Sequence, residues 1–383
     1  MGGLPAAGIG AIRYQPNFFS YSPIANSWKA LAPWLPGVEA KLPQKGSDGC
    51  ADGNGHIYAT KGNNTVGFWQ YTAKPDSAGV WAQKKDVPLG VSNKRVKGGT
   101  GIVWAYKGSV GAAYLLKGYK NEFYRYIPGR DSWSALPDAP IGGSQKWDKG
   151  SWLAWDDVNK KIYAFKAKYM EFYRYSPDGD SWSAQLAPMP ITGSTGNKKA
   201  KAGSSGAYIN GCIYALKGGN TQQFFKYTIA TNTWAEGDTI PRGTEKKKVN
   251  AGSDLATAGM SLYALKGNKC YQFWKYVPGS TDLFAPPQRD GVLAGKTAIT
   301  PGVSISPNPL ANGFAVLRYG LPKAGAAEVS IYNVAGQTVM AQTLVAGRSG
   351  VVNLDLRHLS NGVYLVKFSS EGFANSQKLV VQR

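Results

Sequence analysis

The sequence has few of the residues on which metal sites and catalytic triads depend. Its 383 residues include only three cysteines, Cys50, Cys212 and Cys270, and two histidines, His56 and His358. The cysteine spacings match no metal motif, and three cysteines make no closed disulfide framework. Copper sites need several histidine ligands, and neither histidine lies in a nucleophile motif. We therefore expect no metal, no cofactor and no catalytic triad.

Other signatures of enzymes and of membrane proteins are also missing. The only adjacent acidic pair, Asp156-Asp157, begins a hairpin-like turn, so we do not expect hydrolysis by paired carboxylates. No glycine-rich loop follows a strand and opens a helix, as phosphate-binding loops do. No apolar run is long enough to cross a membrane as a helix, and residues 1–5 lack the basic and apolar regions of a signal peptide. We predict a non-enzymatic protein with no transmembrane segment; if it is exported, we expect its signal to have been removed.

Acidic residues are scarce relative to basic ones. Asp and Glu number 23 against 44 Lys and Arg, which gives a net charge of +21. Residues 1–302 hold 37 of the basic and 20 of the acidic residues, so most of the excess lies there. A partner with many negative charges fits this excess, whether nucleic acid, acidic polysaccharide or lipopolysaccharide. The alternative is that the charge only keeps an aromatic-rich chain soluble.

Internal repeats with a period of about fifty residues dominate the chain, and such a period is typical of propellers. A Tyr-containing segment recurs at residues 57–62, 113–118, 162–167, 213–218 and 262–267. An aromatic quartet follows it at residues 68–71, 123–126, 172–175, 224–227 and 273–276, with a sixth copy at residues 18–21. A tryptophan comes next, at Trp28, Trp81, Trp133, Trp182 and Trp234, with Phe284 in the last place.

Each repeat predicts four short antiparallel strands, which is the composition of a propeller blade. The first strand follows a pair such as Gly46-Ser47, and the other three contain the Tyr segment, the quartet and the tryptophan. Successive side chains alternate between two covered faces of a blade, so we interpret the quartet aromatics as core rather than as a ligand platform.

The order of these segments, followed by Ile240-Pro241-Arg242-Gly243, resembles the kelch repeat. Lys-Gly stands where kelch repeats have a Gly-Gly pair. The resemblance implies an all-β fold with a six-bladed kelch-like β-propeller over residues 1–300. The first blade is short, and we expect residues 291–300 to supply its missing innermost strand and close the ring.

The pattern changes at Ser304, where quartets stop and alternating strands begin. Strand segments are expected at residues 316–319, 327–332, 352–356, 363–368 and 378–381, which predicts a small β-sandwich. The motifs Ser306-Pro307-Asn308-Pro309, residues 329–337 and residues 359–364 resemble the C-terminal sorting domain of the type IX secretion system. The resemblance implies that residues 304–383 address a secreted protein to the secretion machinery for export across a bacterial outer membrane. In such proteins the module is often removed and the remainder is attached to surface lipopolysaccharide or released. The alternative is a generic Ig-like domain with a structural role.

Two sets of lysines recur with the repeats. One set ends the Tyr strand and contains Lys61, Lys117, Lys166, Lys217 and Lys266; the other precedes the first strand and contains Lys45, Lys97, Lys149, Lys201 and Lys248. In an antiparallel blade both positions lie at the same end, so we predict a lysine ring at one mouth of the central channel. Such a ring predicts anion binding. The alternative is that each lysine was copied with its blade and is simply solvated.

Three functions are compatible with these features. The first is an adhesive or scavenging surface protein that binds an anionic polymer, either acidic polysaccharide or nucleic acid. The second is a structural subunit that packs against other surface protein subunits. The third, weaker one is a neutral-glycan lectin that uses tryptophans outside the repeated position, namely Trp34, Trp104, Trp147, Trp152 and Trp155.

Overall fold

The computed structural model describes residues 16–35, 37, 39–279, 284–286, 302–306, 308–311, 313–321, 323, 325–346 and 349–382. The chain divides into two compact units, and each is described by itself. The N-terminal unit comprises Met1–Tyr21 and Ser27–Pro287, and the C-terminal unit comprises Ser22–Asn26 and Gln288–Arg383. Apart from two single-turn 3-10 helices, η1 (Pro128–Arg130) and η2 (Ile229–Thr231), every regular element of the described residues is a strand. The all-β prediction is confirmed.

The N-terminal unit contains one sheet for each repeat, numbered here in chain order. Sheet 1 is a hairpin of β1 (Phe18–Ser22) and β2 (Ser27–Leu31). Sheet 2 contains β3 (Asp48–Ala51), β4 (His56–Thr60), β5 (Phe68–Thr72) and β6 (Val80–Lys84). Sheet 3 contains β7 (Gly101–Lys107), β8 (Val110–Leu116), β9 (Phe123–Ile127) and β10 (Ser132–Leu136). Sheet 4 contains β11 (Trp152–Asp156), β12 (Lys161–Lys166), β13 (Glu171–Ser176) and β14 (Ser181–Trp182).

Two more four-stranded sheets follow. Sheet 5 contains β17 (Ser205–Ile209), β18 (Cys212–Leu216), β19 (Phe224–Thr228) and β20 (Thr233–Glu236). Sheet 6 contains β21 (Asp254–Ala258), β22 (Ser261–Leu265), β23 (Phe273–Tyr276) and β24 (Phe284–Ala285). A small hairpin of β15 (Thr192–Gly193) and β16 (Gly196–Asn197) lies in the connection between sheets 4 and 5.

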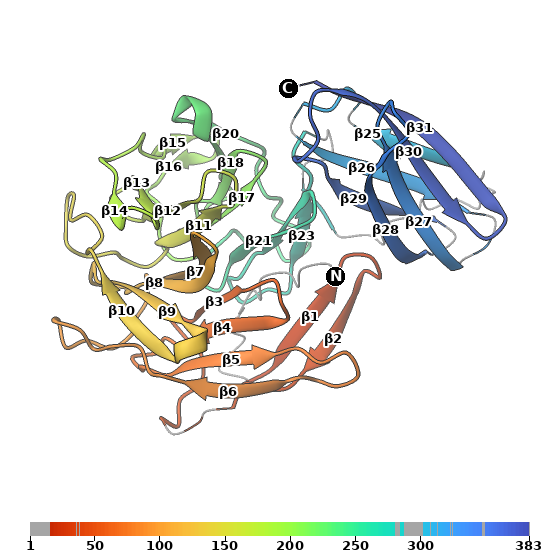
Figure 1. Ribbon diagram of the computed structural model, residues 1–383. Helices are drawn as coiled ribbons and strands as arrows, with labels where there is room; N and C mark the ends of the chain where they lie inside the picture. Colours follow the sequence, from red (N-terminus) through yellow and green to blue (C-terminus); the bar gives the residue numbers. More distant parts are fainter. Residues whose placement is uncertain are drawn as a thin grey trace. The chain divides into compact units, whose positions relative to one another are not determined.

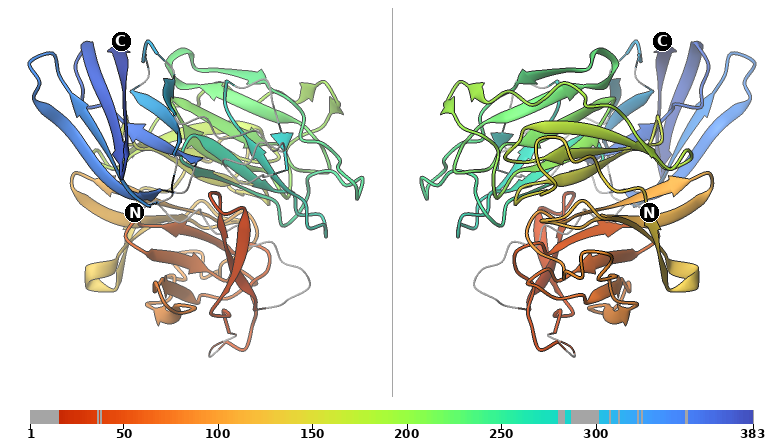
Figure 2. Two further views of the ribbon diagram at one scale, coloured as in Figure 1. Left: turned by 90° about the vertical axis from the view of Figure 1, so that its right-hand side faces the viewer. Right: turned by 90° about the vertical axis from the view of Figure 1, so that its left-hand side faces the viewer.

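The four-stranded sheets share one topology, in which the strands follow chain order and every neighbour is antiparallel. The first strands of successive sheets contact one another: β3 with β7, β7 with β11, β11 with β17, and β17 with β21. The sheets therefore follow one another with their first strands on the inside (Figures 1 and 2), which is a propeller-like arrangement. The predicted closing strand at residues 291–300 lies outside the described residues.

The same aromatic contact joins each sheet to the next. The first quartet residue of one sheet packs edge-on or tilted against the last quartet residue and the repeated tryptophan of the following sheet, with ring centroids 4.7–5.1 Å apart. For example, Phe172 of sheet 4 contacts Tyr227 and Trp234 of sheet 5. Phe273 of sheet 6 makes this contact with Tyr21 and Trp28 of the first hairpin. Each such contact adds about 0.5–1.5 kcal/mol to the area it buries, and the interpretation of the quartets as core is confirmed.

Polar ends of the same aromatic residues add two kinds of hydrogen bond. The repeated tryptophan donates its indole N–H to the chain leaving the preceding sheet, as in Trp182 to the Pro137 carbonyl at 2.9 Å. The last quartet tyrosine donates its hydroxyl to the turn between the third and fourth strands of its own sheet. Tyr175 reaches Asp180 at 2.9 Å, and Tyr126 reaches Asp131 at 2.6 Å. Each repeat thus fixes both its own turn and its neighbour.

The C-terminal unit has two sheets around one core. One contains β25 (Gly302–Ser306), β26 (Phe314–Gly320) and β29 (Ser349–Asp355). The other contains, in spatial order, β28 (Thr338–Ala346), β27 (Gly325–Tyr332), β30 (Gly362–Ser370) and β31 (Phe373–Val381). Their alternating inward side chains, such as Leu317, Val329 and Phe368, form the core of a β-sandwich. The five expected strand segments fall in β26, β27, β29, β30 and β31, whereas β25 and β28 are additional.

Candidate functional site

The strand register places both lysine sets at one end of the sheets. The first residue of each inner strand pairs with a residue at the end of the second strand, as Asp48 does with Thr60 and Asp254 with Leu265. We call this the connection end, because it carries the sheet-to-sheet connections at residues 35–45, 89–97, 141–149, 191–201 and 242–248. The opposite, hairpin end carries the described turns at residues 52–55, 73–79, 108–109, 128–131, 157–160, 177–180, 210–211, 229–232 and 259–260.

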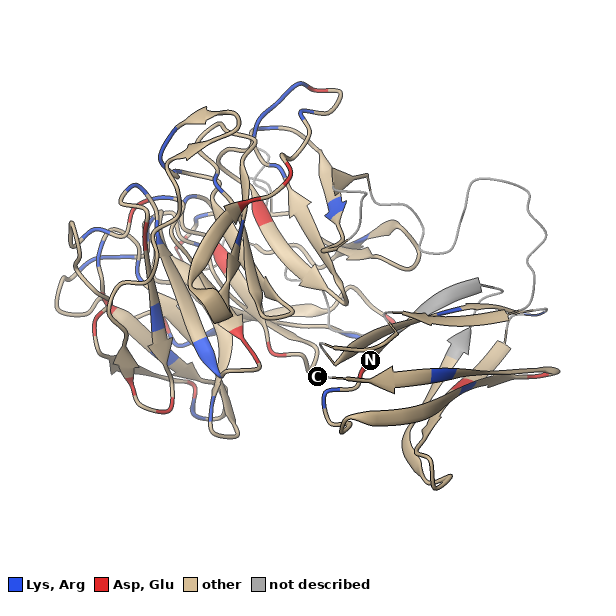
Figure 3. Cartoon of the chain, turned by 90° about the horizontal axis from the view of Figure 1, so that it is seen from above, with Lys and Arg blue, Asp and Glu red and all other residues tan. Residues whose placement is uncertain are grey.

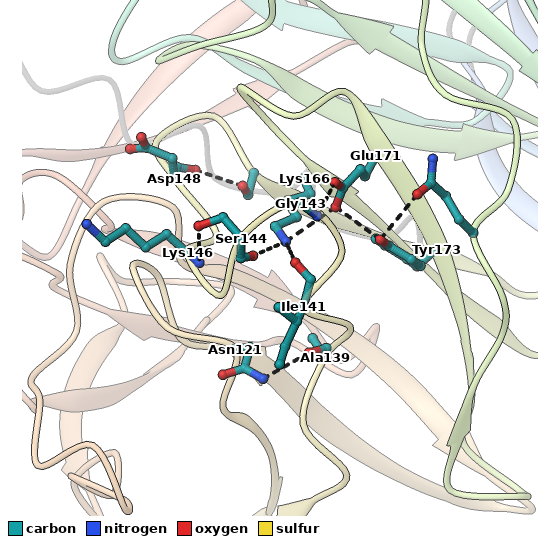
Figure 4. A network of polar contacts seen from close by, with 12 residues as sticks. Asn121, Ala139, Ile141, Gly143, Ser144, Lys146, Asp148, Lys166, Glu171 and Tyr173 are labelled. Atoms are coloured by element: carbon teal, nitrogen blue, oxygen red, sulfur yellow. Dashed lines mark hydrogen bonds and ion pairs between the residues drawn. The ribbon is translucent and has the colours of Figure 1, made fainter.

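The first lysine set is buried, which corrects the prediction that it rings a solvent-facing mouth. Lys61, Lys117, Lys166, Lys217 and Lys266 are no more than 1% exposed. Each ammonium group donates to a backbone carbonyl of the connection entering its own sheet. Lys117 donates to the Pro88 and Leu89 carbonyls at 2.9 and 2.6 Å. Lys166 donates to the Ile141 and Ser144 carbonyls and pairs with Glu171 at 3.3 Å (Figure 4).

The remaining buried lysines repeat this arrangement with small changes. Lys61 binds the Leu35 carbonyl, Lys217 the Ile191 carbonyl and Lys266 the Pro241 carbonyl. Most of these ammonium groups lie near an aromatic ring of the quartet; that of Lys61 is 4.5 Å from the centre of the Trp69 ring. Burial lowers the pKa of Lys61, Lys217 and Lys266 to about 8, and it also lowers the pKa of Lys117 and Lys166. A buried cation held by carbonyls is a structural tie, since an anionic polymer cannot reach it.

The second lysine set is accessible to solvent, with Lys45 and Lys201 exposed and Lys97, Lys149 and Lys248 half-buried. Lys45, Lys97 and Lys149 come from the turns that enter sheets 2, 3 and 4, and they line one depression of about 540 Å³. Lys94, Lys120 and Lys146 line it as well, together with amide side chains at Gln44, Asn63 and Asn64. No acidic residue is among its lining residues, and within the described part of the chain none of these six lysines forms an ion pair. Lys201 and Lys248 do not line this depression.

Close packing of glycine turns brings these lysines together. Gly46 has a φ of +86°, and a Cβ atom there would lie 2.0 Å from the Lys97 carbonyl oxygen of the next sheet. A Cβ atom on Gly98 would lie 2.8 Å from Cγ of Lys149, so the Lys149 stem crosses the turn of sheet 3. Lysines of neighbouring sheets therefore stand close enough to focus a positive potential in the depression.

The two predicted lysine sets do not include three members of this group, Lys94, Lys120 and Lys146. Lys120 follows the buried Lys117 by three residues, in the loop that leads from the second to the third strand. Between them lies Tyr119, which lines the depression and has a φ of +63°, an uncommon value for a bulky residue. The position of Lys120 in this loop could have indicated its place, because the loop and the connection that enters the sheet lie at the same end of the sheet.

Charge is divided unequally between the two ends. The five connections contain fourteen Lys and Arg against three acidic residues, whereas the described hairpin turns contain three Lys and Arg against six acidic residues. Lys and Arg are frequent in the loops of the N-terminal unit (Figure 3). The positive charge of the loops is therefore concentrated in the connections.

The structure corrects the candidates for neutral-sugar stacking. Trp34, Trp147 and Trp152 are buried. Trp34 stacks on Trp81 with centroids 4.5 Å apart, and the Trp152 indole donates to Ser204 at 3.1 Å. Trp104 and Trp155 are half-buried on the inner strands. Three of the five therefore serve the core, and a stacking platform made of all five does not exist.

The described residues contain no cluster of His, Cys, Asp and Glu that could hold a metal ion. His56 begins β4, and its Nδ1 lies 2.7 Å from Oδ2 of Asp52, which closes the first hairpin turn of sheet 2. Desolvation and the nearby Asp254 carboxylate raise the pKa of Asp48 above its usual range, and desolvation raises the pKa of Asp254. Both carboxyl groups open inner strands and accept backbone N–H donors. No helix of the described chain has the length and apolar character needed to span a bilayer.

Comparisons with known proteins find a matching family for the C-terminal unit and distant structural similarity for the chain as a whole. No curated protein matches the chain. Among solved structures, a protein of unknown function from Bacteroides thetaiotaomicron is 14% identical, with a TM-score of 0.48 over 72% of this chain and 70% of that one. An auxiliary nutrient binding protein from Bacteroides thetaiotaomicron is 9% identical, with a TM-score of 0.44 over 70% and 68%. A luciferin-regenerating enzyme is 12% identical, with a TM-score of 0.44 over 70% and 84%. Similarity this low says nothing about ligand or activity.

The C-terminal unit matches a known protein family. Residues 304–382 match the family model described as a secretion system C-terminal sorting domain. The chain therefore carries a sorting domain that marks a secreted or cell-surface protein.

Proposed function

We propose that the chain is a secreted, non-enzymatic binding protein that captures a polyanion, either acidic polysaccharide or nucleic acid. In this proposal the N-terminal unit is a six-bladed kelch-like β-propeller. The six equivalent aromatic contacts, the last of which joins sheet 6 to sheet 1, support that architecture. Residues 304–383 form an Ig-like module that directs export through the type IX system to the outer-membrane surface or beyond.

The observation that carries the binding proposal is the depression lined by Lys45, Lys94, Lys97, Lys120, Lys146 and Lys149. Ammonium groups without acidic partners repel one another, so counterions or a ligand must gather there. Amide groups at Asn63 and Asn64 add hydrogen-bonding capacity beside the charges. A polymer spanning three sheets can contact several lysines at once and release a counterion at each.

The test is retention on heparin and binding of a single-stranded oligonucleotide, each measured over a series of salt concentrations. Wild-type binding is expected to weaken steeply with salt. The triple variant Lys45→Gln/Lys97→Gln/Lys149→Gln should elute at lower salt, and its log–log salt slope with the oligonucleotide should fall by about 2. The matched control is Lys74→Gln/Arg130→Gln/Lys160→Gln, which removes the same charge from the hairpin end.

Two results would overturn the proposal. One is wild-type retention that does not change with salt. The other is an equal loss in the control variant, since net charge rather than the depression would then account for binding. A defined assembly with protein subunits that survives high salt would favour the structural alternative.

A further inference from the structure

Among the described residues of the N-terminal unit, six exposed large apolar side chains lie at the connection end and three, Val80, Val110 and Val158, at the hairpin end. Leu35, Leu89, Ile141 and Ile191 occupy the same place in four successive connections and are 39–60% exposed. Val91 and Tyr271 are also exposed, on a connection and on a loop of the same end. Single exposed apolar residues are ordinary, but recurrence at one structural position on one end is not.

The buried lysines explain why these four side chains point outward. The carbonyl of each one accepts a hydrogen bond from the buried lysine of its own sheet: Lys61, Lys117, Lys166 and Lys217 respectively. With the carbonyl held inward, the backbone turns the side chain toward solvent, in agreement with the exposed fractions. The fifth connection has Arg242 at this place, beside the Pro241 carbonyl that binds Lys266.

An apolar residue precedes the basic residues in each of the first four connections. Each of the first four begins with an aliphatic residue and ends with lysines near the inner strands, as in Ile141 followed by Lys146 and Lys149. The aliphatic residues therefore lie toward the outer strands, and the lysine depression lies inside them. The hairpin end shows no such order, and its described turns are rich in acidic residues.

We propose that the connection end docks on an anionic lipid surface, with the aliphatic residues inserted among acyl chains and the lysines on phosphate headgroups. This inference goes beyond the proposed function: it uses the same lysine depression and assigns the exposed aliphatic side chains around it to a second, lipid partner. A hydrated polysaccharide or nucleic acid gives aliphatic side chains no apolar environment, whereas the boundary of a lipid layer does. Juxtaposed lysines and exposed apolar side chains are the two signals that together give stable attachment to such a surface. Tyr271 adds an aromatic side chain of the kind that favours this boundary.

The experiment is co-sedimentation of the full chain with vesicles of phosphatidylcholine, with and without phosphatidylglycerol. The test variant is Leu89→Ser/Ile141→Ser/Ile191→Ser, which keeps every carbonyl that the buried lysines need. The matched control is Val80→Ser/Val110→Ser/Val158→Ser, which removes similarly exposed side chains from the opposite end. Heparin retention of every variant is measured in parallel.

Wild type is expected to sediment with phosphatidylglycerol vesicles and far less with phosphatidylcholine alone. The test variant should lose partitioning by about ten-fold or more with unchanged heparin retention, while the control variant matches wild type. Vesicle binding by the test variant equal to wild type overturns the inference, as does wild type that binds heparin but not vesicles. Wild type without heparin retention removes the proposed function itself, so the two failures are distinguishable.

Discussion

The five connections at one end of the sheets contain fourteen basic residues against three acidic ones, whereas the described hairpin turns at the other end hold six acidic residues and three basic ones. The acidic residues of the hairpin end fold their own turns: Asp131 and Asp180 each accept a tyrosine hydroxyl. At the connection end the charges fall into two groups, since buried lysines bind carbonyls and the lysines of the depression form no ion pair with a described residue. A charged side chain with a partner inside the protein therefore stabilises the fold, and a charged side chain without such a partner is available to a ligand.

The largest expected effect separates the two kinds of lysine. Lys166→Ala removes the only cation paired with the buried Glu171 carboxylate in the described chain, together with the ammonium donor to two carbonyls, so we expect the free energy of unfolding to fall by about 3–5 kcal/mol. Lys97→Ala, on the surface, should change it by less than about 0.5 kcal/mol. Denaturant unfolding of both variants checks this. Equal effects in the two variants would contradict the distinction between lysines that stabilise the fold and lysines that are available to a ligand.

A second prediction compares glycines of similar backbone conformation at opposite ends. Gly46 (φ +86°) approaches the Lys97 carbonyl, whereas a Cβ atom on Gly53 (φ +78°) would meet nothing within 4 Å. Gly53→Ala should therefore cost about 1 kcal/mol from backbone strain alone. Gly46→Ala should cost about 2 kcal/mol more, because the next sheet must move away. Thermal unfolding of the two variants gives the difference, and equal costs would mean that the glycine turns are not in close contact.

The smallest expected effects concern how stability depends on pH. The two ends of the sheets should contribute to this dependence in different pH ranges. Lys61, Lys217 and Lys266 have pKa values of about 8 when folded, against about 10.4 in an unfolded chain. The unfolded chain thus binds more protons between these values, and stability should rise from about pH 8 toward pH 10. The Lys85 amide and the Tyr126 hydroxyl hold the pKa of Asp131 below its usual range, so that contribution is lost as the pH falls below about 4.

Melting temperatures measured across both windows check this difference. A rise of about 1–3 °C between pH 8 and pH 9.5 is expected for wild type. Lys217→Met should show a smaller rise, because one of the buried lysines with a lowered pKa is gone. A melting temperature that falls through this window in wild type would contradict the burial of charged lysines.

Repeat spacing made much of the fold predictable. The quartets and tryptophans predicted the strands, their antiparallel order and their role as core, because the aromatic residues at the first, second and fourth quartet positions point to both faces of a sheet and need cover on both. The sorting module was readable from motifs such as Ser306-Pro307-Asn308-Pro309. The burial of each lysine set was harder to predict from the sequence. The set that ends the second strand of each sheet is buried, whereas Lys45, Lys97 and Lys149 of the other set line the depression.

By itself, the sequence determined the class of fold, the end of the sheets on which both lysine sets lie, and the presence of a sorting module. These follow from periodicity and motif, which are local properties of the chain. Only the tertiary structure decided which lysines face solvent, because burial depends on the connection that each sheet receives from its neighbour. The carbonyls of Leu35, Leu89, Ile141 and Ile191 lie 25–28 residues before the lysines they bind, and chain packing alone brings them together.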